Sequence, residues 1–266
     1  MSSNTGRDMQ ERPSPVVIHV PHSSRLIPDE FCDQFGCTQE QIDDAHASLV
    51  DHDTDVMASG LTQVVRFPFS RLLLDVERFW DDDAEPMAAV GMGAIYSVDH
   101  ELRSLNRRVT ECDKAKLRRL YDDHHRALEA AVDAGLAEHG RCLIIDLHSY
   151  PTEKLHYEIS TGHRPQLCIG SDQFHTPTQL VEQVEKIVDE HRFESGVNSP
   201  FQGSIVPLKH YQKDPRVTTV MLEWRRDTYQ TNGVTDPAGL VKIARVIADL
   251  VKTIEAEPDT STGTTK

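Results

Sequence analysis

The stretch RCLIIDLHSY (141–150) decides the fold, because an uninterrupted apolar run, CLII, opens directly into the polar motif DLHSY. An apolar run without polar alternation is typical of a strand that is buried on both faces. Two further segments have the same form: PVVIHV (15–20) runs into PHSS, and TTVMLEWRR (218–226) ends in charged residues. The three segments therefore predict buried strands with polar groups at their carboxyl ends.

Helical patterns alternate with these strands. Amphipathic periodicity and end signals predict helices at 38–60, 113–140, 176–193 and 237–256, with Thr38 and Gln41 as a capping box and Thr176 as a cap. LTQVVRFPF, SRLLLDV and PQLCIGS are further strand candidates. This order predicts an α/β fold, with a mixed, mostly parallel central sheet and helices on both faces. In such sheets ligands bind at the carboxyl ends of the strands.

The length and net charge of the chain limit the number of domains and the classes of ligand. The chain has 266 residues and a net charge of −15, from 28 basic and 43 acidic residues. This charge argues against binding to nucleic acid or to anionic membrane surfaces. We expect one domain over 15–256, with disordered tails at 1–14 and 257–266, because no linker or repeat divides the chain and both ends are polar.

The cellular compartment follows from cysteines and hydropathy. Five cysteines, without a C-x-x-C pair, indicate a reducing compartment. Neither a secretory apolar region nor a run of about 18 apolar residues is present. The expectation is a cytoplasmic protein without a membrane-spanning segment.

Candidate metal ligands stand at the ends of the predicted strands 15–20 and 141–150 and in the predicted helix 38–60. His22 and His148 both stand in loops at predicted strand ends, where imidazoles can reach a bound metal. Asp51 and Asp55 are four residues apart and are expected to share a helix face, so either can supply a carboxylate. A solvated acidic helix is the alternative for these two. Asp146 is placed to orient a neighbouring group, and His19 is expected to be buried with its hydrogen bonds satisfied.

A carboxylate and three arginines form the other candidate group. Glu223 ends a buried strand, where a charge is costly unless it is paired or used. Arg225 and Arg226 can pair with it or bind an anionic substrate. Arg78 follows another apolar run, and its planar guanidinium suits a carboxylate, although Asp75 and Glu77 are competing partners.

Seven motifs in order resemble the N-formylglutamate amidohydrolase family, which is itself similar to zinc carboxypeptidases. They are VPHSS, Asp51 in its helix, DVER, YDDHH, DLHS, NSPFQG and LEWRR, and they span about residues 15–230. The resemblance implies a phosphorylase/hydrolase-like, zinc carboxypeptidase-like fold. It also implies an enzyme that hydrolyses the amide bond of an N-acyl amino acid such as N-formylglutamate, a small-molecule substrate that carries a carboxylate.

The resemblance assigns roles to individual residues. His22, Asp51 and His148 would hold Zn²⁺, with Asp55 as the reserve ligand, and Glu223 would act as the general base. The substrate-binding residues would be Arg78, one of Arg225 and Arg226, Asn198 and Gly203 of the NSPFQG loop, and His125.

Two departures from the family motifs leave the identity of the substrate undecided. The family usually shows D-x-N-R where this chain has Asp75, Val76, Glu77 and Arg78, and it commonly has PHSG where this chain has PHSS. Glu77 thus puts a charge in place of an amide. A hydrolase that acts on a peptide or a cell-wall amide is therefore an alternative, and so is an inactive, ligand-binding homologue.

Overall fold

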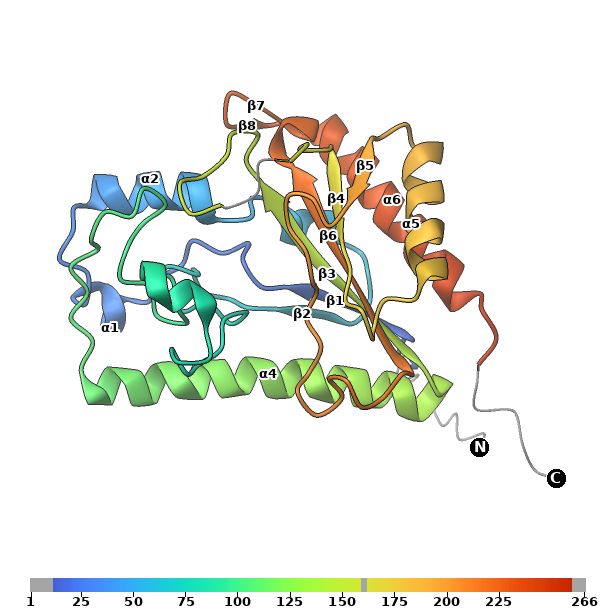
Figure 1. The fold of residues 1–266 in the computed structure, drawn as a ribbon, viewed down its shortest axis with the longest axis horizontal. Helices are drawn as coiled ribbons and strands as arrows, with labels where there is room; N and C mark the ends of the chain where they lie inside the picture. Colours follow the sequence, from blue (N-terminus) through green and yellow to red (C-terminus); the bar gives the residue numbers. More distant parts are fainter. Residues whose placement is uncertain (1–11, 159–161, 260–266) are drawn as a thin grey trace, which may run out of the picture.

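A six-stranded sheet forms the centre of the protein (Figure 1). The structure is a computed structural model, and it describes residues 12–158 and 162–259. The strand order is β2-β1-β3-β6-β4-β5. β1, β2, β3 and β6 are parallel to one another, whereas β4 runs antiparallel to β6 and carries β5 parallel to itself. The strands are β1 (Val16–Val20), β2 (Val64–Arg66), β3 (Cys142–Tyr150), β4 (Leu167–Gly170), β5 (Ser195–Val197) and β6 (Val217–Arg225). A separate hairpin pairs β7 (Gln230–Thr231) with β8 (Val234–Thr235).

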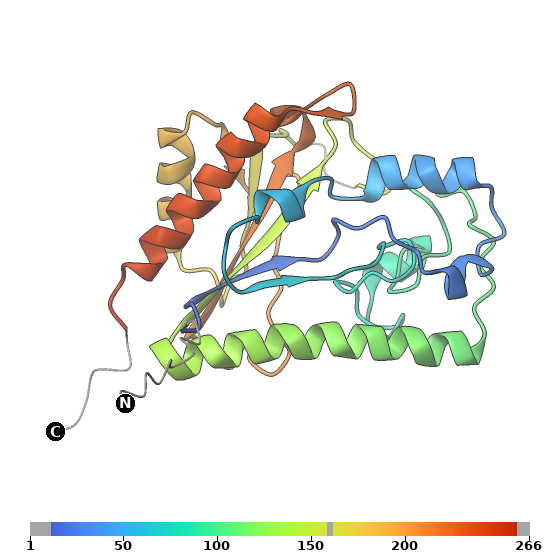
Figure 2. The same cartoon turned by 180° about the vertical axis from the view of Figure 1, so that it is seen from behind.

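Helices cover both faces of this sheet (Figures 1 and 2). The long helix α4 (Glu111–His139) packs on one face, where Leu128 and Val132 join a core with Val17 and Ile144. α5 (Thr178–Glu190) and α6 (Pro237–Glu255) pack on the other face. The mixed, mostly parallel α/β sheet that the sequence predicts is therefore confirmed. The remaining helices are α1 (Asp29–Cys32), α2 (Gln39–Leu49), α3 (Thr54–Met57) and the 3₁₀ helices η1 (Pro86–Val90) and η2 (Arg226–Thr228).

Strand alternation gathers polar side chains on the α4 face. Within β3, Leu143, Ile145 and Leu147 belong to the core under α5 and α6, so Asp146 and His148 point the other way. The register places Asp146 beside His19 of β1. Buried polar groups thus line the sheet directly beneath α4.

Local signals fix the ends of α4. The Thr110 hydroxyl accepts from the backbone N–H of Asp113, and the Asp113 carboxylate accepts from the N–H of Thr110, which completes a capping box. Gly140 ends the helix with φ 71°, a left-handed conformation that glycine adopts without a Cβ clash. The predicted helix at 113–140 is confirmed, with two added residues at its start.

Three expectations about individual elements are wrong. The predicted helix at 38–60 breaks after Leu49, and Asp53 takes a left-handed φ of 62° before α3 begins. SRLLLDV forms turns around a buried apolar cluster instead of a strand. Thr176 does not cap α5: Pro177 holds the cap position, and the Thr176 hydroxyl donates to the carbonyl of Thr219 at 2.6 Å.

The chain ends are placed only in part. Residues 1–11 and 260–266 of the two expected tails lie outside the described residues. Ser14, which the sequence assigned to the first tail, is buried and donates to the carboxylate of Glu255 at 2.7 Å. Within 12–158 and 162–259, no helix is long and apolar enough to cross a membrane.

Candidate metal centre

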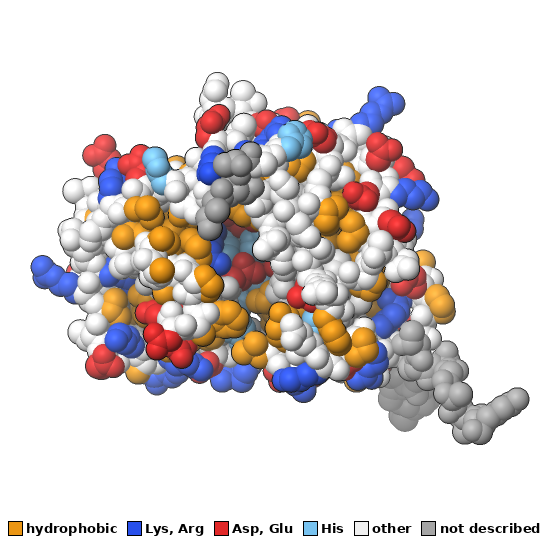
Figure 3. Space-filling view, in the orientation of Figure 1, with side chains coloured by type: hydrophobic (Ala, Val, Ile, Leu, Met, Phe, Trp, Pro, Cys, Tyr) orange, Lys and Arg blue, Asp and Glu red, His pale blue; other side chains and the backbone are white. Residues whose placement is uncertain are grey.

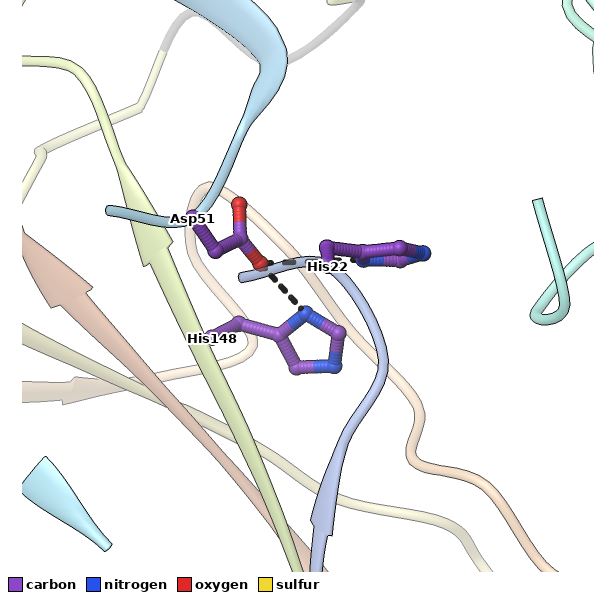
Figure 4. A group of neighbouring side chains, drawn as sticks. All are labelled: His22, Asp51 and His148. Atoms are coloured by element: carbon purple, nitrogen blue, oxygen red, sulfur yellow. Dashed lines mark hydrogen bonds and ion pairs between the residues drawn. The ribbon is translucent and has the colours of Figure 1, made fainter. Parts of the chain in front are cut away.

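Two histidines and an aspartate from three separate elements meet at the carboxyl ends of β1 and β3 (Figure 4). His22 follows β1, Asp51 stands between α2 and α3, and His148 lies on β3. Asp51 Oδ2 is 2.9 Å from His148 Nδ1 and 3.6 Å from His22 Nδ1. All three side chains are buried. In a tetrahedral site with zinc–ligand bonds of about 2.0–2.1 Å, neighbouring donor atoms lie about 3.3 Å apart, so these separations suit one ion.

Each of the two imidazoles is oriented by a second carboxylate. His22 Nε2 lies 2.8 Å from Asp75 Oδ1, and His148 Nε2 lies 3.0 Å from Asp146 Oδ1. An ionised carboxylate only accepts, so each Nε2 carries a proton, and Nδ1 is the ring nitrogen left to bind a metal. Without a metal, His148 Nδ1 donates to the Asp51 carboxylate at 2.9 Å, a contact that an ion bound between the two groups would replace. His22 Nδ1 is a buried nitrogen without a hydrogen-bond partner among the described residues. An unpartnered lone pair of this kind is the donor that a metal ion requires, and the residues present therefore fit zinc.

Asp75 is held by three partners. Besides His22, it accepts from Arg71 at 2.8 Å and from the Tyr96 hydroxyl at 2.6 Å. Burial acts against its charge, but His22 and Arg71 outweigh burial and hold the pKa of Asp75 well below its usual range. From the sequence, Asp75 was expected only as a partner of Arg78. No sequence pattern indicated that Arg71 and Tyr96 contact it.

The turn that presents Asp51 is tied to the rest of the site. The N–H of Asp51 donates to the carbonyl of His22 at 3.0 Å, which joins two of the three side chains through the backbone. Arg226 donates to the carbonyls of Val50 and Ala47 at 2.8 and 3.0 Å. The expected role of Arg226 was substrate binding, whereas its contacts in the structure hold this turn in place.

Asp55, the reserve ligand, does not face this centre. It lies on α3, and its carboxylate accepts from Arg66 of β2 at 2.7 Å. The expectation that Asp51 and Asp55 share one helix face is wrong, because α2 ends before Asp51 and the left-handed residue Asp53 turns the chain between them.

Glu223 lies beside His148 on the neighbouring strand, since the two residues pair in the register of β3 and β6. Its Oε2 is buried and has no hydrogen-bond partner among the described residues. Burial raises the pKa of Glu223 to about 8, with His148 opposing and Asp51 adding to the rise. A partly buried, perturbed carboxyl at a strand end has the properties of a group that gains and loses a proton in a reaction.

Glu77 is a further carboxylate that faces this centre. Its Oε2 is 3.3 Å from His148 Nε2 and 3.6 Å from His22 Nδ1, and its Oε1 is 3.6 Å from His19 Nδ1. Its carboxylate makes no hydrogen bond of good geometry within the described part of the chain, and its side chain is 15% exposed. Glu77 therefore stands at the open side of the centre, toward solvent.

Arg78 and His125 lie together next to this group. The Tyr121 ring contacts the His125 ring at 4.3 Å between centroids, and the Tyr121 hydroxyl donates to the carbonyl of Arg78 at 2.9 Å. Arg78 Nε and His125 Nε2 are both buried without a hydrogen-bond partner in the described residues. The Nε–H of Arg78 is therefore an unpaired donor suited to an anionic ligand, whereas neutral His125 donates to the Val76 backbone and presents Nε2 as an acceptor.

The remaining predicted binding residues have protein partners. Arg225 pairs with Asp227 at 2.8 Å and donates to the carbonyl of Arg164. Both groups of the Asn198 amide bond to Ser171, at 2.8 and 2.9 Å. Gly203 has φ 86° in the loop that follows, and this loop reaches the centre through the N–H of Ile205, which donates to Asp146 at 3.2 Å.

The centre lies where the surface is hollowed. Figure 3 shows a hollow above α4, with acidic, basic and histidine side chains at its floor and hydrophobic side chains around its rim. The hollow coincides with the carboxyl ends of β1 and β3 in Figure 1. A small molecule can therefore approach the buried histidines from this side.

Comparison with known proteins agrees with this architecture. The chain is similar to the crystal structure of N-formylglutamate amidohydrolase from Ralstonia eutropha JMP134, with a TM-score of 0.77 and 21% identity over 92% of this chain and 94% of that one. It is also similar to gene product Atu2144 from Agrobacterium tumefaciens, with a TM-score of 0.64 and 17% identity over 91% and 92% of the two chains. No curated protein matches it at a significant level. Because the model of the N-formylglutamate amidohydrolase family matches residues 14–230, most of its length, the chain belongs to that family of amide-hydrolysing enzymes.

Proposed function

We propose that this protein is a zinc-dependent amidohydrolase that cleaves the amide bond of an N-acyl amino acid such as N-formylglutamate. One observation carries the proposal: His22 and His148 each turn Nε2 onto a buried carboxylate and Nδ1 toward Asp51. Carboxylate–histidine pairs of this kind orient the ligands of catalytic zinc sites.

Two nitrogen donors and one carboxylate leave a coordination position open, as hydrolytic zinc sites do. His22, Asp51 and His148 would hold the ion, and the ion would supply a Lewis acid that polarises the scissile carbonyl and lowers the pKa of a water. Asp75 and Asp146 keep both imidazoles in the tautomer that this requires.

Glu223 would be the general base. It would take a proton from the attacking water at its unpartnered Oε2 and return that proton to the nitrogen of the leaving amine. Its raised pKa is suited to the second step, because a group that holds a proton near neutral pH can deliver it to the leaving amine. A dication next to His148 would favour the ionised form at the start of the reaction, since an opposite charge lowers the pKa of a carboxyl group.

Arg78 would bind a carboxylate of the substrate. Its guanidinium lies close enough to Asp75 for that charge to raise its pKa against the effect of burial, yet its side chain makes no hydrogen bond within the described residues. Its planar donors therefore remain available for two-point contact with a carboxylate. His125 stands beside it with an unpaired Nε2 that can accept a hydrogen bond from the substrate.

Glu77 supports a second candidate substrate. Its carboxylate faces three imidazoles at the open side of the centre and adds a negative charge where a dianionic substrate would bind. A peptide or a cell-wall amide with less negative charge would meet less repulsion there.

A substrate screen separates these candidates. The purified zinc-loaded protein would be assayed with N-formylglutamate, neutral N-formyl amino acids and short peptides. Release of the free amino acid from N-formylglutamate supports the first candidate, and preferential peptide cleavage supports the second. If none of these substrates is cleaved while the protein binds them, the chain is a ligand-binding homologue and the proposal is wrong.

A further inference from the structure

A row of buried hydrogen bonds extends from the candidate metal centre to helix α4. His148 Nε2 lies 3.0 Å from Asp146 Oδ1, the same oxygen lies 2.8 Å from His19 Nδ1, and His19 Nε2 lies 2.8 Å from His124 Nε2. His19 is fully buried, and Asp146 and His124 are at most 6% exposed.

The protons in this row can be assigned one after another. Asp146 Oδ1 lies within hydrogen-bonding distance of a ring nitrogen of His148 and a ring nitrogen of His19, and a carboxylate oxygen only accepts. His148 Nε2 and His19 Nδ1 must therefore both donate to it. A neutral His19 then has a lone pair on Nε2, and the nitrogen 2.8 Å away must be an N–H of His124.

His124 is suited to be that donor. Burial lowers the pKa of His124, so the ring stays neutral and carries one proton. The opposite arrangement would require His19 to carry protons on both nitrogens, which adds a buried charge. An apolar residue at 124 would leave the lone pair of His19 without a donor in a dry site.

From this row we infer that His124 is a positioning residue: through His19 and Asp146, its Nε2–H helps to hold the carboxylate that fixes a proton on His148 Nε2, so that Nδ1, which faces Asp51, is the nitrogen available to a metal. His124 touches neither substrate nor metal. Its assignment as a support for a zinc ligand rests on the proposed function, whereas the proton positions on His148 Nε2, His19 and His124 concern the metal-free protein.

The tautomers can be read from long-range ¹H–¹⁵N correlation spectra of the metal-free protein labelled with ¹⁵N-histidine. We expect protons on His148 Nε2, His19 Nδ1 and His124 Nε2, and an acceptor signal from His19 Nε2. A proton on His19 Nε2 in the wild-type protein would overturn the inference without any variant.

Variants test the effect on the metal. Zinc affinity, measured by chelator competition, should fall about tenfold in His124→Met, the lower end of what loss of an outer-shell partner costs. His124→Gln, whose amide N–H can replace the donor, should restore most of the affinity. His210→Met is the matched control, because His210 is also buried and bonds to Asp133 of α4 at 2.9 Å, away from the centre.

The outcomes are distinguishable. Wild-type affinity and wild-type His148 signals in His124→Met would show that His124 only fills space, and the inference would be wrong. Absence of zinc binding by the wild-type protein would contradict the proposed function, while the expected proton positions could still be found in the spectra.

Discussion

His148 and Glu223 stand opposite each other in the register of β3 and β6. The two strands are parallel neighbours, so both side chains leave the sheet on the side that α4 covers. A candidate metal ligand and a candidate proton carrier are thereby fixed side by side on the two longest strands of the sheet. Rigid strands hold such a pair more accurately than loops do.

Replacing Glu223 separates proton transfer from metal binding. Glu223→Gln keeps the shape of the side chain and removes the base, so the protein should fold and bind zinc as before. We expect kcat to fall by roughly 10²–10⁴-fold with KM little changed, the usual contribution of a positioned general base. Loss of zinc from this variant would make Glu223 a ligand, and near-normal turnover would assign the base to another group, with Glu77 the first to examine.

The two acidic residues that the sequence left open are now distinguishable. Asp51→Asn should weaken zinc binding by more than the roughly 10–100-fold that loss of an outer-shell partner costs, because a direct ligand is removed. Asp55→Asn should bind zinc normally, since Asp55 pairs with Arg66. Chelator titrations that rank the two variants in reverse would refute the placement of the metal.

Arg78 is expected to act in substrate binding. Arg78→Ala should raise KM for acidic N-acyl substrates by roughly 10–100-fold, because a charge-assisted hydrogen bond contributes about 1.5–3 kcal/mol. KM for neutral analogues should change little. Arg66→Ala, which removes a half-exposed arginine that pairs with Asp55, is the control. Equal changes in KM for acidic and neutral substrates would show that Arg78 does not bind the substrate carboxylate and is only a structural partner of Asp75.

Stability should decrease in mild acid because of His46. Burial, assisted by the charge of Arg25, lowers the pKa of this α2 residue to about 4, and its Nε2 lies 2.9 Å from Ser70 Oγ. Between pH 6.5 and 4 the unfolded chain binds a proton that the folded protein does not, so stability is lost as pH falls through this window and no further below it. At pH 5 the loss from this residue is about 2 kcal/mol.

Urea unfolding at pH 7 and pH 5 measures this loss. Wild-type protein should lose about 2 kcal/mol more stability between the two pH values than His46→Gln does, since glutamine does not titrate. The same pH dependence in both proteins would show that His46 is protonated in the folded state.

The sequence predicted the fold because apolar runs that open into polar motifs identify buried strands without tertiary information. RCLIIDLHSY and TTVMLEWRR both became central strands, and their polar ends meet at the same edge. SRLLLDV has the same apolar character but forms turns. An apolar run indicates burial, and whether it becomes a strand depends on a partner strand that only the whole fold supplies.

The candidate site was predictable where spacing along one strand places the residues, as for Asp146 and His148. The partners of Asp75 were not, because Arg71 and Tyr96 reach it through turns that carry no periodic pattern. Arg226 shows the converse case. An arginine at a strand end suggests an anion site. Here, however, the guanidinium donates its hydrogen bonds to the backbone carbonyls of Ala47 and Val50, at and just before the α2–α3 turn.

The central claim is that His22, Asp51 and His148 bind one catalytic zinc ion, and metal content tests it most directly. Elemental analysis of the protein, purified without chelator and dialysed against zinc, should give about one zinc per chain. The double variant His22→Ala, His148→Ala should give none, while remaining folded by circular dichroism. Full zinc occupancy in the double variant, or a wild-type protein that stays metal-free and still hydrolyses its substrate, would contradict the account.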